Sequence, residues 1–333
     1  MTFPTATISV PALQHNLARV KQSAANSKVM SVIKADAYGH GIITVAEALK
    51  QSDAFAVARL SEAVSLRQQG VTLPIVILEG VNTADDFQLA AQLSLSPVIH
   101  LSSQVDVLKS MTLSQPLKFN WIMVDSGMHR LGIRPEQVEA TILALQASGN
   151  MNHELGLMSH FANSDLVGDI RNRHQLEHML SLKEKTGLPV CLSNSAAVLA
   201  YPESHLDWVR PGLMLYGISP FAETTSAEHG LEPVMQLTTR LISTYDLNIG
   251  EQVGYGGDWT AKQPSRIGVA SIGYGDGYQY DPDTKDGFSG QNYFPDGMER
   301  TSFYKPVERG FEREIKKRLD YWDKLREKKQ NDI

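Results

Sequence analysis

Eight short runs of apolar and β-branched residues alternate with amphipathic stretches between residues 28 and 215, and this alternation constrains the fold most strongly. Strands separated by helices of about 10–15 residues form βαβ units, whose strands lie parallel in one sheet. Eight strands of this kind predict an α/β fold with a closed (β/α)8 barrel of the TIM type, and an open, doubly wound sheet of the same periodicity is the alternative. The expected strands are residues 29–33, 54–58, 74–78, 97–100, 119–124, 154–159, 189–193 and 206–210, and the expected helices include residues 42–50, 60–69, 83–93, 135–147 and 170–186.

Five polar clusters, most of them containing glycine, follow the ends of predicted strands. Because the strands of a barrel all end at one rim, these clusters are expected to come together there. The clusters are KADAYGHG (34–41), DSGMHRLG (125–132), SHFANSD (159–165), SNSAA (193–197) and RPGLMLYG (210–217). The sequence therefore predicts an active site at the carboxyl end of the barrel.

Lys34 follows an apolar strand, and this position suits a reactive amine. Burial lowers the pKa of a lysine because the charged form loses hydration, and the neutral amine can then form a Schiff base with a carbonyl group. A lysine at a strand end can equally well extend its amine into water. The motif that follows favours the first interpretation, since its glycines allow close approach of the backbone and Tyr38 offers a hydroxyl suited to a phosphate.

A second pattern suited to phosphate follows the last expected strand. Arg210 is followed by Pro211 and Gly212, which form a fixed turn with a backbone N–H that can face an anion. An ordinary turn between a strand and a helix explains the same residues. Asn194 and Ser195, after the seventh strand, add a helix N-cap and a hydroxyl.

Other functional classes find no support in the sequence. His40, His129 and His160 lack the spacing of metal ligands, and His160 alone is more often a hydrogen-bonded buried histidine. No GxxxxGK[ST] motif is present, and the net charge of −6 argues against nucleic-acid binding. No apolar run is long enough to span a membrane, and a single cysteine, Cys191, fits a reducing compartment, so a cytoplasmic protein is expected.

The composition changes in the last third of the chain. Residues 234–245 and 266–272 are typical of antiparallel strands in a second, β-rich domain, and beyond residue 278 we expect a loop and one charged helix over residues 308–329. Residues 281–333 carry 12 basic and 12 acidic side chains, whereas the preceding 280 residues carry 19 and 25. A change this abrupt indicates a solvated terminal helix or a segment of different origin.

The clusters at the strand ends resemble the motifs of bacterial alanine racemases. VIKADAYGHG (32–41) resembles the family's pyridoxal-phosphate attachment motif. The family's other motifs follow in its order, as DSGMHRLG, HFANSD, NSAA, RPGLMLYG, VGYGG (253–257) and IGYGDGY (272–278). The resemblance covers residues 1 to about 278, and implies a fold-type III barrel with a β-domain, working as a head-to-tail homodimer.

The resemblance also implies a reaction, the interconversion of L- and D-alanine that supplies D-alanine for peptidoglycan. Lys34 would hold pyridoxal 5'-phosphate and act as base on one face of the α-carbon of alanine. Tyr274 of the partner subunit would act on the opposite face, and Arg130 would help to bind the substrate carboxylate. Serine is the alternative substrate.

The same resemblance assigns residues to the cofactor. Arg210 would face the pyridine nitrogen, and His160 would lie in the hydrogen-bond network of Arg210 and Tyr274. The phosphate would be held by Tyr38, Ser195 and the backbone N–H groups of Gly212 and Leu213.

Two features depart from the family. Met123 occupies the position where many members carry a carbamylated lysine that orients the arginine matching Arg130. The β-domain stops near Tyr278, and the remaining segment resembles the C-terminus of replication-associated recombination AAA+ ATPases of the MgsA/RarA type. The sequence thus predicts a chimera with a pyridoxal-phosphate-binding barrel (1–228), an incomplete β-domain (229–278) and an unrelated tail (279–333).

Two other functions stay open at this point. A barrel without a complete β-domain could hold the cofactor and lack racemase activity. The tail could instead make the chain an interaction or oligomerisation module.

Overall fold

The computed structural model describes residues 4–273 of the 333-residue chain. The described residues divide into two compact units, Ala6–Gln236 and a smaller one that contains residues 237–273 together with residues 4–5. The expected boundary at residues 228/229 lies eight residues before this division. The expected seam near Tyr278, the loop after it and the helix over residues 308–329 lie outside the described residues.

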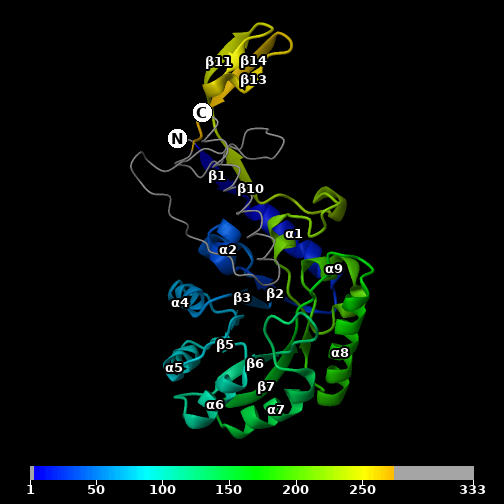
Figure 1. Cartoon of the computed structure of the whole chain (residues 1–333). Coiled ribbons are helices and arrows are strands. Elements are labelled where there is room, and N and C mark those ends of the chain that lie inside the picture. Colours follow the sequence, from blue (N-terminus) through cyan, green and yellow to red (C-terminus); the bar gives the residue numbers. More distant parts are fainter. Residues whose placement is uncertain (1–3, 274–333) are drawn as a thin grey trace, which may run out of the picture. The chain divides into compact units, whose positions relative to one another are not determined.

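The larger unit is an eight-stranded parallel sheet that closes on itself (Figure 1). Strands that are neighbours in sequence pair along the sheet except for the fourth and fifth, and the last strand pairs with the first. An isolated parallel bridge between Ile99, two residues after the fourth strand, and Ile122 of the fifth closes the barrel. The strands are β2 (Lys28–Val32), β3 (Ala54–Val57), β4 (Ile75–Ile77), β5 (Ser96–Pro97), β6 (Leu117–Met123), β7 (Met151–Met158), β8 (Val190–Cys191) and β9 (Trp208–Val209). The closed (β/α)8 barrel is confirmed over the open sheet, and all eight expected strands are present with shifted or shortened ends.

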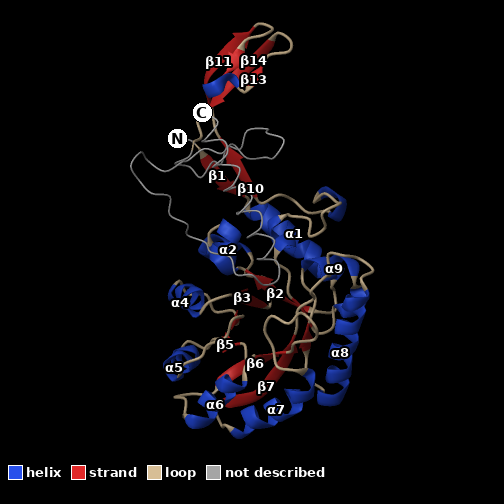
Figure 2. Ribbon diagram, viewed as in Figure 1, coloured by secondary structure: helices blue, strands red, loops and turns tan. Residues whose placement is uncertain are grey.

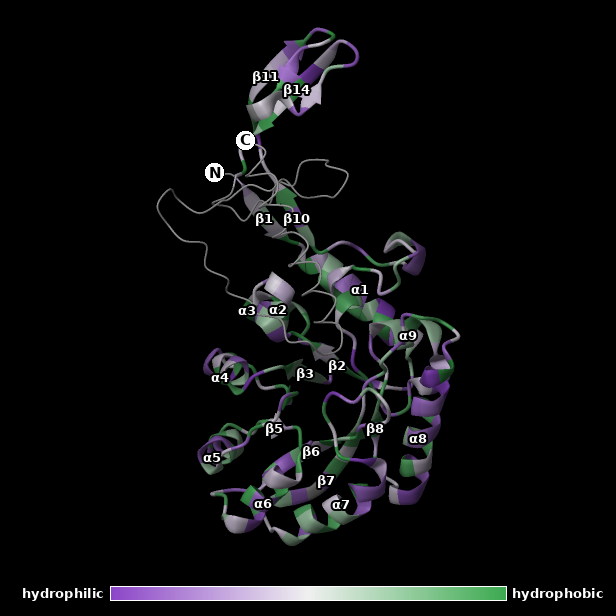
Figure 3. Cartoon of the chain, in the orientation of Figure 1, coloured by the Kyte–Doolittle hydropathy of each residue, from purple (hydrophilic) through white to green (hydrophobic). Residues whose placement is uncertain are grey.

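Helices surround the barrel strands (Figure 2). They are α1 (Val10–Ser23), α2 (Lys34–Gly39), α3 (Ile42–Ala48), α4 (Leu60–Gln68), α5 (Ala84–Gln92), α6 (Ser102–Ser110), α7 (Val138–Ala147), α8 (Ile170–Thr186) and α9 (Ser195–Ala200). The five expected helices are confirmed, and residues 135–147 begin with a short 3-10 turn before α7. Hydrophilic and hydrophobic residues are mixed along α8 (Figure 3), and its buried apolar residues, Leu176, Met179 and Leu182, recur every three residues on the inner face. None of the described helices is long and apolar enough to cross a bilayer.

Two apolar clusters form the core of this unit. One lies between the sheet and the helices, and the other fills the barrel with side chains that include Met30, Val76, Trp121 and Cys191. Cys191 is buried and free, and burial raises the pKa of its thiol to about 11. The thiol is therefore an inert part of the packing.

Arg67 on α4 joins two neighbouring αβ connections, the one from α4 to β4 and the one from α5 to β5, through its guanidinium group. Its three nitrogens donate to four backbone carbonyl groups, at 2.6–3.1 Å. The carbonyl groups belong to Val71, Leu73, Leu93 and Ser94. The side chain thus satisfies carbonyls that no regular element reaches.

Replacing Arg67 by methionine should therefore destabilise the barrel while keeping the apolar stem. We expect the free energy of unfolding to fall by about 3 kcal/mol, because several partly buried carbonyl groups lose a charged donor. Urea unfolding measures this, and Arg173→Met on the exposed face of α8 is the control. Equal stability of the two variants would contradict the role given to Arg67.

The other described strands form three sheets of two strands each. β11 (Leu241–Leu247) pairs with β14 (Ser265–Ala270), and β12 (Gln252–Val253) pairs with β13 (Trp259–Thr260). The prediction of one continuous strand over residues 234–245 is wrong, because residues 239–240 belong to no strand and divide the segment in two. Its first half is β10 (Met235–Thr238), which pairs with β1 (Thr5–Ile8), a strand that the sequence did not predict.

Candidate active site

A cavity of about 480 Å3 opens at the carboxyl ends of the barrel strands. All five polar clusters contribute to its wall, as the sequence predicts for residues that follow successive strands. The expected site residues that line it are Lys34, Tyr38, Arg130, His160, Ser195, Arg210, Gly212 and Leu213. Tyr274 lies outside the described residues. No group of three or more potential metal ligands exists in the part of the chain that the structure describes.

Lys34 comes two residues after β2 and brings its amine into this cavity wall. Burial lowers its pKa, and the guanidinium groups of Arg130 and Arg210 lower it further, while the carboxylate of Glu62 opposes them. These influences increase the fraction of neutral amine, the form that can act as nucleophile or base.

The protonation of Lys34 can be followed in the protein without cofactor. Because its pKa is lowered, its reaction with an acylating reagent should rise with pH at a midpoint below 10.5, the value of an ordinary lysine. Arg130→Met removes one cation and should move this midpoint upward. Mass spectrometry of the labelled peptide across pH measures both, and a wild-type midpoint at or above 10.5 would contradict the electrostatics described here.

The residues after Lys34 form an unusual left-handed turn. Ala35, Asp36, Ala37 and Tyr38 have φ values of 54°, 50°, 54° and 55°. This conformation costs an L-residue about 1–2 kcal/mol, so contacts with the surroundings must hold it. The turn brings the Tyr38 hydroxyl to 2.8 Å from the point where a side chain on Gly212 would begin. Only glycine therefore fits at position 212 without displacing Tyr38.

Arg210 is buried at the base of the cavity, with 4% of its surface exposed. One terminal nitrogen, Nη2, donates to the Ser159 carbonyl at 2.7 Å and contacts His160 Nδ1 at 2.9 Å. The other, Nη1, is buried without a hydrogen-bond partner among the described residues. A guanidinium nitrogen only donates, so Nδ1 of His160 is an acceptor and its proton resides on Nε2. Burial, then the charges of Arg210, Arg130 and Lys34, lower the pKa of His160 well below 6.5 and keep it neutral.

The turn after β9 meets the start of α9 at the cavity. Ser195 Oγ accepts from the Gly212 N–H at 2.9 Å and from the Met214 N–H at 3.3 Å. Asn194 is the N-cap of α9, as expected, because its side chain accepts from the Ala197 N–H. The Gly212 N–H that the sequence offers to a phosphate is thus held by Ser195 in this structure.

Arg130 lies on a tight turn that begins at Asp125. One carboxylate oxygen accepts from the N–H groups of Gly127 and His129, and the other lies 2.9 Å from His129 Nδ1. Burial alone would raise the pKa of Asp125, but these hydrogen bonds outweigh it and lower the pKa. Met123 lines the same cavity as Arg130 and offers it no charge.

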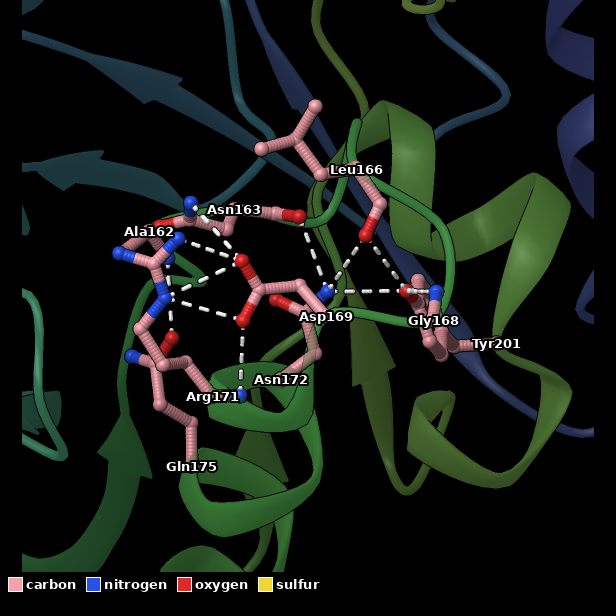
Figure 4. A network of polar contacts seen from close by, with 9 residues as sticks. All are labelled: Ala162, Asn163, Leu166, Gly168, Asp169, Arg171, Asn172, Gln175 and Tyr201. Atoms are coloured by element: carbon pink, nitrogen blue, oxygen red, sulfur yellow. Dashed lines mark hydrogen bonds and ion pairs between the residues drawn. The ribbon is translucent and has the colours of Figure 1, made fainter.

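A hydrogen-bond network fixes the loop that carries His160 (Figure 4). Gln175 of α8 donates to the His160 carbonyl at 2.9 Å and accepts from the Ala162 N–H at 2.9 Å. The hydroxyl of Tyr201 accepts from Asn172 Nδ2 at 2.8 Å and from the Gly168 N–H at 3.1 Å. Side chains of α8 and the segment after α9 therefore hold the loop after β7 in place.

Two residues near Lys34 were not singled out by the sequence. Tyr216 is buried, packs against Tyr38 with the rings tilted by 40° and their centroids 4.9 Å apart, and donates its hydroxyl proton to the Val32 carbonyl. It belongs to the cluster RPGLMLYG, and its place in that cluster is the sequence feature that could have identified it as a site residue. Glu62 accepts a hydrogen bond from the backbone N–H of Ala35. In the sequence, a glutamate three residues after the N-cap of a helix indicates only that it caps that helix.

Comparison with known proteins identifies two families. The family model described as "Alanine racemase, N-terminal domain" matches residues 8–220, and the family model described as "MgsA AAA+ ATPase C terminal" matches residues 261–323. Alanine racemases from Nitrosococcus oceani and Vibrio cholerae are 46% and 44% identical over 278 residues, which are 84% of this chain and 78% and 77% of theirs. The structure of the biosynthetic alanine racemase from Pseudomonas aeruginosa has a TM-score of 0.77 at 42% identity, covering 84% of this chain and 78% of that one. That from Acinetobacter baumannii has a TM-score of 0.75 at 39% identity, with the same coverage.

Proposed function

Since the chain belongs to the alanine racemase family, we propose that its barrel binds pyridoxal 5'-phosphate and interconverts L- and D-alanine. One observation carries this proposal. A lysine with a lowered pKa shares a cavity with the buried Arg210, and both belong to motifs of the family. The position of each on a barrel strand end is what a cofactor enzyme of this fold requires.

The residues present fit the cofactor. Arg210 Nη1 is buried without a partner among the described residues, and it therefore offers a donor to the ring nitrogen of a bound group. Gly212 and Tyr38 both line the cavity, and a Cβ at position 212 would lie 2.8 Å from the Tyr38 hydroxyl, so glycine lets the two groups face the cavity together. Tyr38, Ser195 and the backbone N–H groups of Gly212 and Leu213 would hold the phosphate, and the Gly212 N–H would exchange its bond to Ser195 Oγ for one to the phosphate.

The reaction then divides between the cofactor and the chain. Bound pyridoxal phosphate supplies a conjugated ring that stabilises the electron pair left on the α-carbon when its proton is removed. Lys34 would hold the cofactor and remove that proton, and Arg130 would bind the substrate carboxylate. A guanidinium at Arg210 donates but cannot accept, so it keeps the ring nitrogen unprotonated and disfavours transamination.

Inversion at the α-carbon needs a second group on the opposite face, because one base alone would return the proton to the side from which it came. We assign this role to Tyr274 of the partner subunit in a homodimer, with His160 and Arg210 in the same hydrogen-bond network. Alanine is the substrate that the printed names of the relatives support. The single cysteine supports a cytoplasmic enzyme.

A second candidate is a cofactor-binding barrel that does not racemise. The observation that favours it is that all the described residues lining the cavity lie within Ala6–Gln236. These residues include all the groups that we assign to holding the cofactor, whereas racemisation requires Tyr274.

Borohydride reduction after incubation with pyridoxal phosphate should place a pyridoxyl group on Lys34. Peptide mapping by mass spectrometry checks the position, and absence of the adduct would end both candidates. Formation of D-alanine from L-alanine, followed by chiral chromatography, then separates them. An adduct without D-alanine leaves the second candidate, and Tyr274→Phe with unchanged activity would contradict the two-base assignment.

A further inference from the structure

The turn between Lys34 and Tyr38 is held against the preference of its own residues. Four consecutive residues other than glycine have φ between 50° and 55°. L-residues favour the right-handed form, and a turn that relaxed to it would carry the Tyr38 hydroxyl away from Gly212. The turn begins at Ala35, and its backbone N–H is the group that a side chain from outside the segment contacts.

Glu62 of α4 makes this external contact. Its Oε1 accepts the Ala35 N–H at 2.6 Å, and its Oε2 accepts the N–H groups of Ala58 and Arg59 at 2.9 Å each. Ala58 follows β3 directly, and Arg59 is the N-cap of α4. One carboxylate thus ties the peptide that follows Lys34 to the end of the neighbouring barrel strand.

The other contacts that hold the turn are local. Asp36 accepts the Ile42 N–H at 2.7 Å, and His40 Nδ1 lies 3.0 Å from the carbonyls of Ala37 and Tyr38. Among the described residues, no side chain outside the segment 33–42 other than Glu62 hydrogen-bonds to the backbone of the turn. Tyr216 adds packing against the Tyr38 ring.

We propose that Glu62 is a positioning residue, which sets the places of Lys34 and Tyr38 by holding the left-handed turn between them. The inference rests on the proposed function for its meaning, since these two groups would hold the cofactor. Glu62 itself does not line the cavity and acts through the Ala35 peptide.

Three variants separate this role from that of a helix cap. In Glu62→Gln the single carbonyl oxygen can keep the Ala58 and Arg59 N–H groups, and its NH2 group then faces the Ala35 N–H, donor against donor. Glu62→Ala loses both sets of bonds. Glu47→Gln, on the exposed face of α3, removes a charge elsewhere and is the matched control.

Hydrogen–deuterium exchange of the protein without cofactor is the first measurement. We expect amides of residues 33–41 to exchange about tenfold faster in Glu62→Gln than in Glu47→Gln, as the loss of one charge-assisted hydrogen bond implies. Amides of α4 should be unchanged in Glu62→Gln and faster only in Glu62→Ala. Exchange in Glu62→Gln that equals the control, or that rises in α4 together with the turn, would overturn the proposal.

Titration with pyridoxal phosphate is the second measurement. The dissociation constant of Glu62→Gln should be about tenfold above those of the wild type and Glu47→Gln. Equal constants would overturn the proposal. A wild type that takes up no pyridoxal phosphate would instead contradict the proposed function, and the exchange measurement would still decide the role of Glu62.

Discussion

Alanine at position 34 is expected to abolish racemisation, with a loss in kcat/KM of about 10^4-fold or more. Lys34→Ala removes the base for one face of the α-carbon, which alone is worth about 10^2–10^4-fold. It also removes the covalent attachment of the cofactor. The variant therefore loses both the base and the attachment, and the rate should fall by more than the loss of the base alone predicts. The rate of D-alanine formation from L-alanine measures the effect.

The control for this variant is Lys50→Ala, at an exposed position where the side chain pairs with Glu47. It should keep wild-type activity and cofactor content. Lys34→Ala should retain some affinity for pyridoxal phosphate, because Tyr38, Ser195 and Arg210 remain to bind it. Racemisation by Lys34→Ala within tenfold of the wild type would refute the role of Lys34, and the borohydride adduct would then have to be found on another lysine.

The barrel could be predicted because its signal is local and repeated. Each strand is a short apolar run, each helix has its own amphipathic period, and the parallel arrangement follows from their alternation. The site could be predicted for a related reason, since residues that follow successive strands meet at one rim whatever the details of packing. The five polar clusters accordingly line one cavity.

Long-range pairing and strain left weaker signals. β1 and β10 are about 230 residues apart in sequence, and their pairing depends on how the whole barrel brings them together. The left-handed turn of residues 35–38 contains no glycine, so its conformation follows from contacts such as that of Glu62 rather than from propensity. The seam and the tail stay predictions from resemblance, and the match to the MgsA C-terminal model over residues 261–323 supports the chimera.

Arg210→Met should lower kcat/KM by about 10^2–10^3-fold, the loss typical when one buried electrostatic donor is removed from an active site. The substitution takes a fixed positive charge from the cavity and leaves the Ser159 carbonyl and His160 Nδ1 without their donor. Because Arg210 lowers the pKa of both Lys34 and His160, both pKa values should rise in the variant. The same change lets the ring nitrogen of the bound cofactor take up a proton. We therefore expect pyruvate beside D-alanine, in an amount no greater than the pyridoxal phosphate supplied, because the amino group of alanine is transferred to the cofactor, which leaves as pyridoxamine phosphate.

Three measurements on one preparation decide among the explanations for that loss. Arg173→Met, at an exposed position on α8, should behave as the wild type in all of them. If Arg210 acts electrostatically, the acylation midpoint of Lys34 in the cofactor-free variant moves upward, and the variant loaded with pyridoxal phosphate forms pyruvate up to the amount of cofactor supplied. If Arg210 only packs the cavity, Arg210→Met loses activity with an unchanged midpoint and no pyruvate, and the assignment of Arg210 to the ring nitrogen fails. Arg210→Lys keeps a positive charge but lacks the planar guanidinium with its two terminal nitrogens. The acylation midpoint of Lys34 should therefore return to the wild-type value, while the hydrogen bond to His160 should be weaker.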